Sequence, residues 1–230
     1  MSATENALKS LVDPVPLELV EYFDSIEEGS VLDLPENDVG LLRVTECVEQ
    51  TNTFRGFHPV VQCFEGIVLD DPNTSNHHIY LTKSPVSGYI FYLDHDGDSR
   101  IVFASIAEFL KAVQLANETD ECVSDFHPDA AVIVADQKAL SEFIGRLLDD
   151  ENDTDIEEVL LAVIPSMDLT DFSLLERLAT TEDFYTVEAI GSEIARRPDQ
   201  SLLSIASLCA NHEHFQASSA GKAALAAISK

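Results

Sequence analysis

The hydrophobic pattern of the chain changes near residue 117, and this change constrains the fold more than any other feature of the sequence. Before it, short runs rich in β-branched and aromatic residues alternate with turn sequences, as expected of an antiparallel sheet with short connections. After it, leucine, isoleucine and alanine recur at three- and four-residue spacing, which indicates amphipathic helices. We therefore predict an α+β fold, with a small antiparallel-sheet domain flanked by helices over residues 1–116 and a helical, repeat-like region over residues 117–230.

The first region is predicted to begin and end with a helix. The apolar positions of Pro16–Ile26 form one stripe, and Gly29 stands where a helix C-terminus favours glycine. At the other end, Ser105 and Glu108 form a capping box that opens a helix over Ser105–Leu115. Between them we expect five strands, over Gly40–Val48, Pro59–Leu69, His78–Leu81, Tyr89–Leu93 and Arg100–Phe103.

The second region is predicted to be a series of short helices joined by brief connections. The short run Ala131–Val134 is ambiguous between strand and other structure. The expected helices are Lys138–Leu148, Asp155–Ile164, Phe172–Ala179, Phe184–Arg196, Gln200–Ala210 and Ala217–Ile228. Helices of this length with short loops favour stacked helical hairpins, so we expect a HEAT-like array.

One segment carries a family resemblance. Ser87–Val113, SGYIFYLDHDGDSRIVFASIAEFLKAV, runs from a strand through an Asp/Gly turn and a second short strand into a helix opened by serine. With the upstream helix and strands, residues 8–115 resemble a SUKH domain. The aromatic-glycine stretch usual in that superfamily is reduced here to Gly29-Ser30-Val31. The resemblance implies a binding fold, and bacterial members act as immunity proteins that neutralise secreted toxins, many of them nucleases.

The charge balance limits the partners that the chain can bind. The sequence has 13 Lys and Arg against 42 Asp and Glu, a formal net charge of −29. Such a field repels phosphate backbones and anionic membranes, so we expect no binding to nucleic acid or membranes. It attracts basic proteins and accelerates their association. Acidity can also serve solubility alone, or reflect a salt-loving host, and the sequence leaves these alternatives open.

The motifs of enzymes and metal sites are missing or incomplete. Asp94, Asp96 and Asp98 alternate as in a calcium loop, but Ser99 and Ser105 stand where an EF-hand needs glycine and glutamate. We instead predict a tight turn with Gly97 at positive φ. The pairs His77-His78 and His212/His214 lack a third ligand at a metal-site spacing. We expect no metal, no cofactor and no catalytic residues.

The ends and the cysteines of the sequence suggest a compartment. Met1–Glu5 has neither the basic start nor the apolar run of a secretory signal, so we expect a cytoplasmic protein. The four cysteines form no Cys-x-x-Cys pair, and we expect reduced thiols, mostly in core positions. They are Cys47, Cys63, Cys122 and Cys209.

The leading hypothesis is therefore a non-catalytic immunity protein that binds a basic toxin domain, with the helical region as a second contact surface. A scaffold or regulatory adaptor for a cellular protein is the alternative, and an enzyme of unknown type is a third. The acidic run Asp149–Glu158 fits a solvated loop better than a contact site. Phe91 and Tyr92 are further anchor candidates, although strand alternation buries at least one aromatic of this run. The residues predicted to contact the partner are Asp70, Asp71, Asp94, Asp96, Asp98 and Tyr89.

Overall fold

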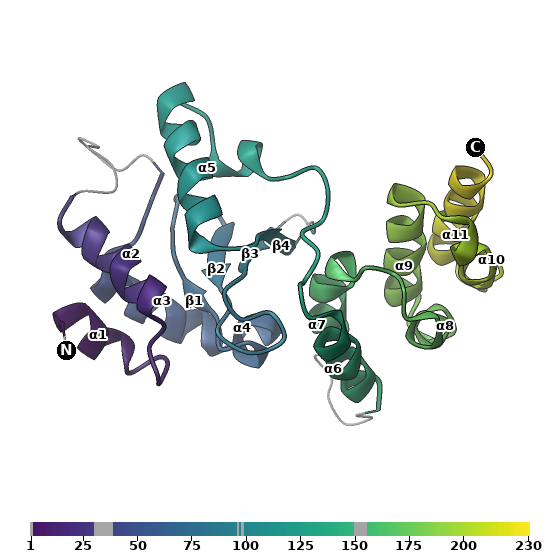
Figure 1. The fold of residues 1–230 in the computed structure, drawn as a ribbon, viewed down its shortest axis with the longest axis horizontal. Helices are drawn as coiled ribbons and strands as arrows, with labels where there is room; N and C mark the ends of the chain where they lie inside the picture. The colour runs from purple at the N-terminus through teal and green to yellow at the C-terminus, as the bar shows by residue number, and fades with distance from the viewer. Residues whose placement is uncertain (1, 30–38, 96, 98, 150–155) are drawn as a thin grey trace. The chain divides into compact units, whose positions relative to one another are not determined.

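The computed structural model describes residues 2–29, 39–95, 97, 99–149 and 156–230, and the chain divides into two compact units. Unit 1 is Met1–Val132 and unit 2 is Ile133–Lys230. Mixed α+β structure with helices in the C-terminal part is confirmed (Figure 1). The predicted boundary after residue 116 falls inside helix α5, Ile106–Thr119. Unit 1 also includes the 3-10 helix η1, Val123–Phe126, which packs on α5.

The sheet of unit 1 is an antiparallel meander of four short strands in sequential order. The register places Ile67 opposite Tyr80, His78 opposite Tyr92, and Phe91 opposite Ile101. Because strands consecutive in sequence are neighbours in the sheet, the whole sheet is local in sequence. The strands are β1 (Ile67–Val68), β2 (His77–Tyr80), β3 (Ile90–Leu93) and β4 (Arg100–Phe103).

Helices pack with this sheet and share the core of unit 1 with its strands and connecting segments. Tyr22 of α2 (Leu17–Glu27) and Phe109 of α5 are fully or almost fully buried, and their ring centroids are 6.4 Å apart. Both predicted helix ends are confirmed: Gly29 has φ +67°, and Ser105 Oγ accepts the backbone N–H of Glu108. A short helix that the sequence analysis missed, α1 (Ala3–Leu8), is opened by Ser2.

Two of the five predicted strands are wrong in whole or in part. Most of Gly40–Val48 belongs to α3 (Val44–Arg55), since Val44, Cys47 and Thr51 are buried at helical spacing. Leu41 alone makes an isolated bridge, to Asp70. The front of Pro59–Leu69 is helix α4 (Pro59–Cys63), begun by a proline at its first position.

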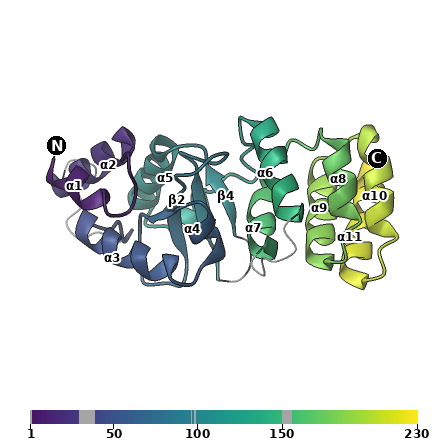
Figure 2. The same ribbon diagram turned by 90° about the horizontal axis from the view of Figure 1, so that it is seen from below.

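Unit 2 contains helices only, within its described residues, and they pack in succession (Figures 1 and 2). Helices α6 and α7, α8 and α9, and α10 and α11 are in contact as pairs, and α7 with α9 and α9 with α11 connect the pairs. The ambiguous run Ala131–Val134 is neither helix nor strand. The helices are α6 (Gln137–Asp149), α7 (Ile156–Val163), α8 (Phe172–Ala179), α9 (Phe184–Arg196), α10 (Leu203–Ala210) and α11 (Phe215–Ile228), with 3-10 turns η2 (Ile164–Ser166) and η3 (Gln200–Leu202).

Close helix contact in unit 2 depends on small residues. A Cβ on Gly191 of α9 would lie 2.9 Å from the backbone of α11, and one on Gly221 of α11 would overlap the backbone of α10. These glycines allow the helix axes to approach more closely than larger residues permit. Among the described residues, we find no helix with the length and apolar character needed to span a membrane.

Candidate functional site

The sequence-predicted contact residues separate into two groups in the structure. Asp71 follows β1 and Asp94 follows β3, and the register of β2 with these strands brings both turns to one end of the sheet. The backbone N–H of His95 donates to Asn76 Oδ1 at 2.8 Å, which joins the two turns. Tyr89 lies at the opposite end of the sheet, before β3, and is half-buried. Asp96 and Asp98 lie outside the described residues.

At this end of the sheet, the Asp71 carboxylate and the backbone of Asp94 form hydrogen bonds within the protein. Asp71 Oδ1 accepts the backbone N–H of Asn73 at 3.1 Å, and its Oδ2 accepts from Gln50 Nε2 at 3.3 Å. The backbone N–H of Asp94 donates to Ser99 Oγ at 2.9 Å in a turn where Gly97 has φ +103°. The predicted positive φ of Gly97 is therefore confirmed. The polar groups of this turn stabilise the turn itself, in the way that short polar residues stabilise many turns.

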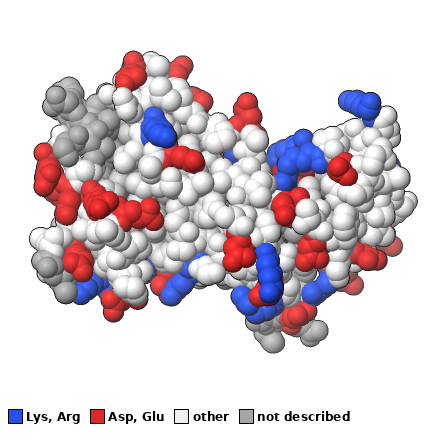
Figure 3. Space-filling model, viewed as in Figure 1, with Lys and Arg blue, Asp and Glu red and all other residues white. Residues whose placement is uncertain are grey.

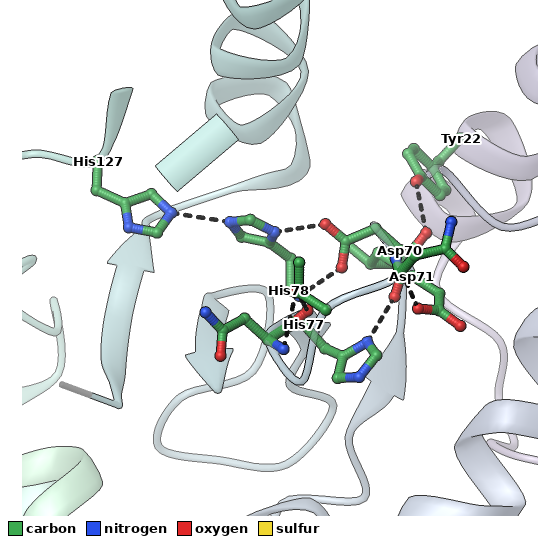
Figure 4. A network of polar contacts seen from close by, with 10 residues as sticks. Tyr22, Asp70, Asp71, His77, His78 and His127 are labelled. Atoms are coloured by element: carbon green, nitrogen blue, oxygen red, sulfur yellow. Dashed lines mark hydrogen bonds and ion pairs between the residues drawn. The ribbon is translucent and has the colours of Figure 1, made fainter. Parts of the chain in front are cut away.

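Asp70 contradicts the prediction that it contacts a partner, because it is only 1% exposed. Its Oδ1 accepts the backbone N–H of His78 at 2.6 Å, and its Oδ2 lies 2.6 Å from His78 Nδ1 (Figure 4). The backbone carbonyl of Asp70 lies 2.9 Å from His77 Nδ1. Asp70 therefore connects the end of β1 to the start of β2 inside the core.

A second imidazole extends this network across unit 1. His78 Nε2 lies 2.8 Å from Nε2 of His127, which directly follows η1 (Figure 4). The His127 ring also packs against Tyr92 of β3, at 4.5 Å between ring centroids. The pKa of His127 is lowered to about 3, first by burial and then by electrostatic interaction with the facing His78 and with Arg100. His127 is thus neutral near pH 7, and the two facing nitrogens share one proton.

The network can hold a proton between two imidazoles, but its inner members do not reach a substrate. His78 is 3% exposed, and it is surrounded by the rings of Tyr92, Phe103 and Phe109. Burial and then the charge of Asp70 raise the pKa of Tyr22, whose hydroxyl donates to the Leu69 carbonyl at 3.4 Å. Within the described residues, no group of three or more His, Cys, Asp or Glu side chains could hold a metal ion. The geometry therefore fits a structural connection between η1 and the sheet.

One group of exposed carboxylates in unit 1 lies on and directly after α2 and on α3, and none of its members was among the predicted contact residues. We call this surface the α2–α3 acidic face, and Figure 3 shows Asp and Glu side chains gathered over these helices. Arg43 lies at its edge and pairs with Glu27, at 3.3 Å. One member is also held from the sheet, since the Tyr80 hydroxyl donates to Glu18 Oε1 at 2.5 Å. The exposed members are Glu18, Glu21, Glu27, Glu28, Glu46 and Glu49.

The α3 part of this surface was missed because Gly40–Val48 was predicted to be a strand that ends before Glu49. On α3, Glu46 and Glu49 are three residues apart and share one face. The helical spacing of Val44, Cys47 and Thr51 was the signal that could have located them. The cysteine prediction is corrected as well: Cys47 and Cys209 are buried, but Cys63 and Cys122 are exposed, and none of the four is in a disulfide.

Comparison with known proteins gives no match for this chain: no family model, no curated protein and no solved structure resembles it significantly.

Proposed function

We propose that this protein is a non-catalytic binding module for a basic protein, and that its partner is a toxin domain which it neutralises as an immunity protein. The observation that carries the proposal is the formal net charge of −29. Even if every Lys and Arg paired with one carboxylate, most carboxylates would remain without a cation. A folded protein with this field attracts basic partners and suppresses binding to acidic ones.

The distribution of the carboxylates supports a whole-surface effect. Figure 3 shows Asp and Glu side chains spread over the visible face of each unit. Residues 1–132 contain 6 Lys and Arg against 24 Asp and Glu, and residues 133–230 contain 7 against 18. The α2–α3 acidic face is the part of unit 1 that we assign to first contact, because its carboxylates are exposed and carried on helices.

The toxin assignment depends on the SUKH resemblance of residues 8–115. A nuclease toxin is basic where it binds phosphate, so an acidic protein can cover that surface. The alternative is an adaptor that binds a cellular protein, and the charge supports it equally well. The two functions differ in the identity of the partner, and not in the physics of binding.

Affinity capture from the native cells tests the proposal. The tagged full-length chain is used as bait, and bound proteins are eluted in a salt series and identified. A bait with two carboxylates of the α2–α3 acidic face neutralised (Glu21→Gln with Glu28→Gln) serves as comparison. We expect one basic, toxin-like protein in near-equal amount, released as salt rises. Co-expression of that protein with the chain should restore growth that the toxin alone abolishes.

Several housekeeping proteins without a toxin would contradict the immunity function and favour the adaptor. A partner that is acidic, or that stays bound regardless of salt, would contradict the basic-partner proposal itself.

A further inference from the structure

Unit 2 carries an exposed aromatic surface at the beginning of two neighbouring helices. Phe184 and Tyr185 open α9, and His214 and Phe215 open α11. The rings of Phe184 and His214 stack, with centroids 3.7 Å apart, and Tyr185 lies 4.0 Å from Phe184. This stack fixes the two helix ends beside each other. We call these four residues the aromatic ledge.

The outer members of the ledge are unusually open to solvent. Phe215 is 80% exposed and Tyr185 is 44% exposed. Neither is needed to close the core, which α9 and α11 form with other residues such as Val187, Ile190 and Ala224. Large exposed aromatic groups at neighbouring helix ends of a folded protein are typical of contact surfaces, where they act as anchors.

Carboxylates surround the ledge. Asp183 is the N-cap of α9, Glu182 precedes it, and Glu213 lies between the two histidines before α11. The start of α7 adds Glu157, whose pKa is raised by burial and by the neighbouring Asp183 and Glu158. The rim of the ledge is therefore negative, which determines the kind of partner that fits.

We propose that the aromatic ledge binds a segment of a basic protein in which a large apolar side chain is flanked by Lys or Arg. The apolar side chain packs on Phe215 and Tyr185, and the flanking cations contact the carboxylates and the ring faces. A second copy of this chain is a poor occupant, because both surfaces would carry the same negative charge. This inference rests on the proposed function and adds a contact surface in unit 2.

Two synthetic peptides test the ledge on the full-length chain. Both are labelled and carry Lys and Arg along one side; one has a central Trp, and the other has Ser in its place. Binding is followed by fluorescence anisotropy at about 50 mM and about 300 mM salt. We expect the Trp peptide to bind about tenfold more tightly than the Ser peptide, with a preference that survives the higher salt.

Variants locate the preference. Phe215→Ala should remove the difference between the two peptides, and Glu182→Gln with Glu213→Gln should weaken both peptides at low salt. Phe172→Ala is the control, because Phe172 is an exposed aromatic residue outside the ledge, 44% exposed like Tyr185. Phe172 starts α8, so it lies roughly 10 Å along that helix from the turn that leads into α9. Circular dichroism checks that each variant keeps its helices.

The outcomes separate the ledge from the proposed function. Equal binding of the Trp and Ser peptides, or an unchanged preference in Phe215→Ala, would overturn the ledge while leaving a basic-partner surface elsewhere. No binding of either peptide at low salt would overturn the ledge and also contradict the basic-partner proposal.

Discussion

The two units connect their helices by different kinds of contact. In unit 1, polar side chains join segments far apart in sequence: the Arg55 guanidinium donates to the carbonyls of Leu11, Glu65 and Gly66 at 2.7–3.1 Å, and the Asp70–His78–His127 network joins β1, β2 and the segment after η1. In unit 2, helices approach through glycine, and the buried carboxylate Glu193 pairs locally with Arg196 and Arg197. Arg197 also makes long-range polar contacts in this unit, since it donates to the carbonyls of Met167 and Pro165.

Because of this difference, different substitutions and conditions should destabilise each unit. A network of buried polar groups is sensitive to the loss of one partner and to protonation, because an unpaired buried group has a large desolvation cost. A close helix contact is sensitive to side-chain volume, because the backbone cannot move without separating the helices.

A methyl group at Gly221 should give the largest loss of stability. Its Cβ would lie 2.5 Å from the carbonyl carbon of Cys209 on α10. We expect Gly221→Ala to destabilise unit 2 by about 3 kcal/mol in urea unfolding followed by circular dichroism. In the control Gly145→Ala, the nearest atom is 3.7 Å away on the Arg177 side chain, and alanine should stabilise α6 by up to about 1 kcal/mol. Equal stability of Gly221→Ala and wild type would show that α10 and α11 can separate freely.

Loss of the Asp70 carboxylate should have a somewhat smaller effect, confined to unit 1. Asp70→Ala leaves the backbone N–H and ring of His78 buried without their acceptor, which should cost about 2–3 kcal/mol in the same unfolding experiment. Asp71→Ala is the neighbouring control; because Asp71 is half-buried, its hydrogen bonds are worth about 1 kcal/mol. Similar losses for the two variants would mean that the network does not support unit 1.

Acid should weaken unit 1 through His127. The unfolded imidazole takes up a proton near pH 6.5, whereas the folded one does so only near pH 3. The unfolded state therefore binds more protons in this window, and the stability present near pH 7 is lost as the pH falls from about 6.5 towards 3. For a partly exposed group we expect roughly 1 kcal/mol between pH 7 and pH 4.

His127→Gln provides the comparison for that pH series. The variant should show a shallower fall of unfolding free energy with acid than wild type. If the unfolding free energy fell equally with acid in the variant and in wild type, His127 would not be the group that makes unit 1 sensitive to acid.

Much of the fold could be predicted because local signals agreed with the tertiary structure. The bounds of Arg100–Phe103, Phe172–Ala179 and Phe184–Arg196 match the sequence prediction. For the two helices, Asp171 and Asp183 cap the N-terminus and the leucine and isoleucine spacing is unambiguous. In Val44–Val48 a short alternation was compatible with both periods, and helix α3 formed instead.

The candidate sites were harder to predict, because they depend on contacts that no local pattern encodes. Asp70 meets His78 through the register of β1 and β2, and His127 comes from 49 residues further along the chain. A carboxylate beside a turn was expected to face solvent, but Asp70 is buried, where it forms hydrogen bonds with His77 and His78. The aromatic ledge was also missed, because its halves are the starts of separate helices joined only by the packing of α9 on α11.

Thiol labelling reports the unfolding of each unit separately, without any substitution that changes stability. Burial raises the pKa of Cys47 in unit 1 to about 12 and that of Cys209 in unit 2 to about 11. Maleimide should therefore modify Cys63 and Cys122 in the folded chain and reach the buried pair only on unfolding. In rising urea, mass spectrometry of the labelled peptides then reports each unit through its own cysteine. Equally fast labelling of all four without urea would contradict the described cores.

The proposal that the negative charge attracts a basic partner is tested most directly by the association rate constant. It is measured by stopped flow, as salt is varied, for the full-length chain with its captured partner. We expect the rate constant to fall by about tenfold or more between about 50 mM and about 500 mM salt, because screening removes the attraction that steers encounter. A rate constant that does not change with salt would contradict it.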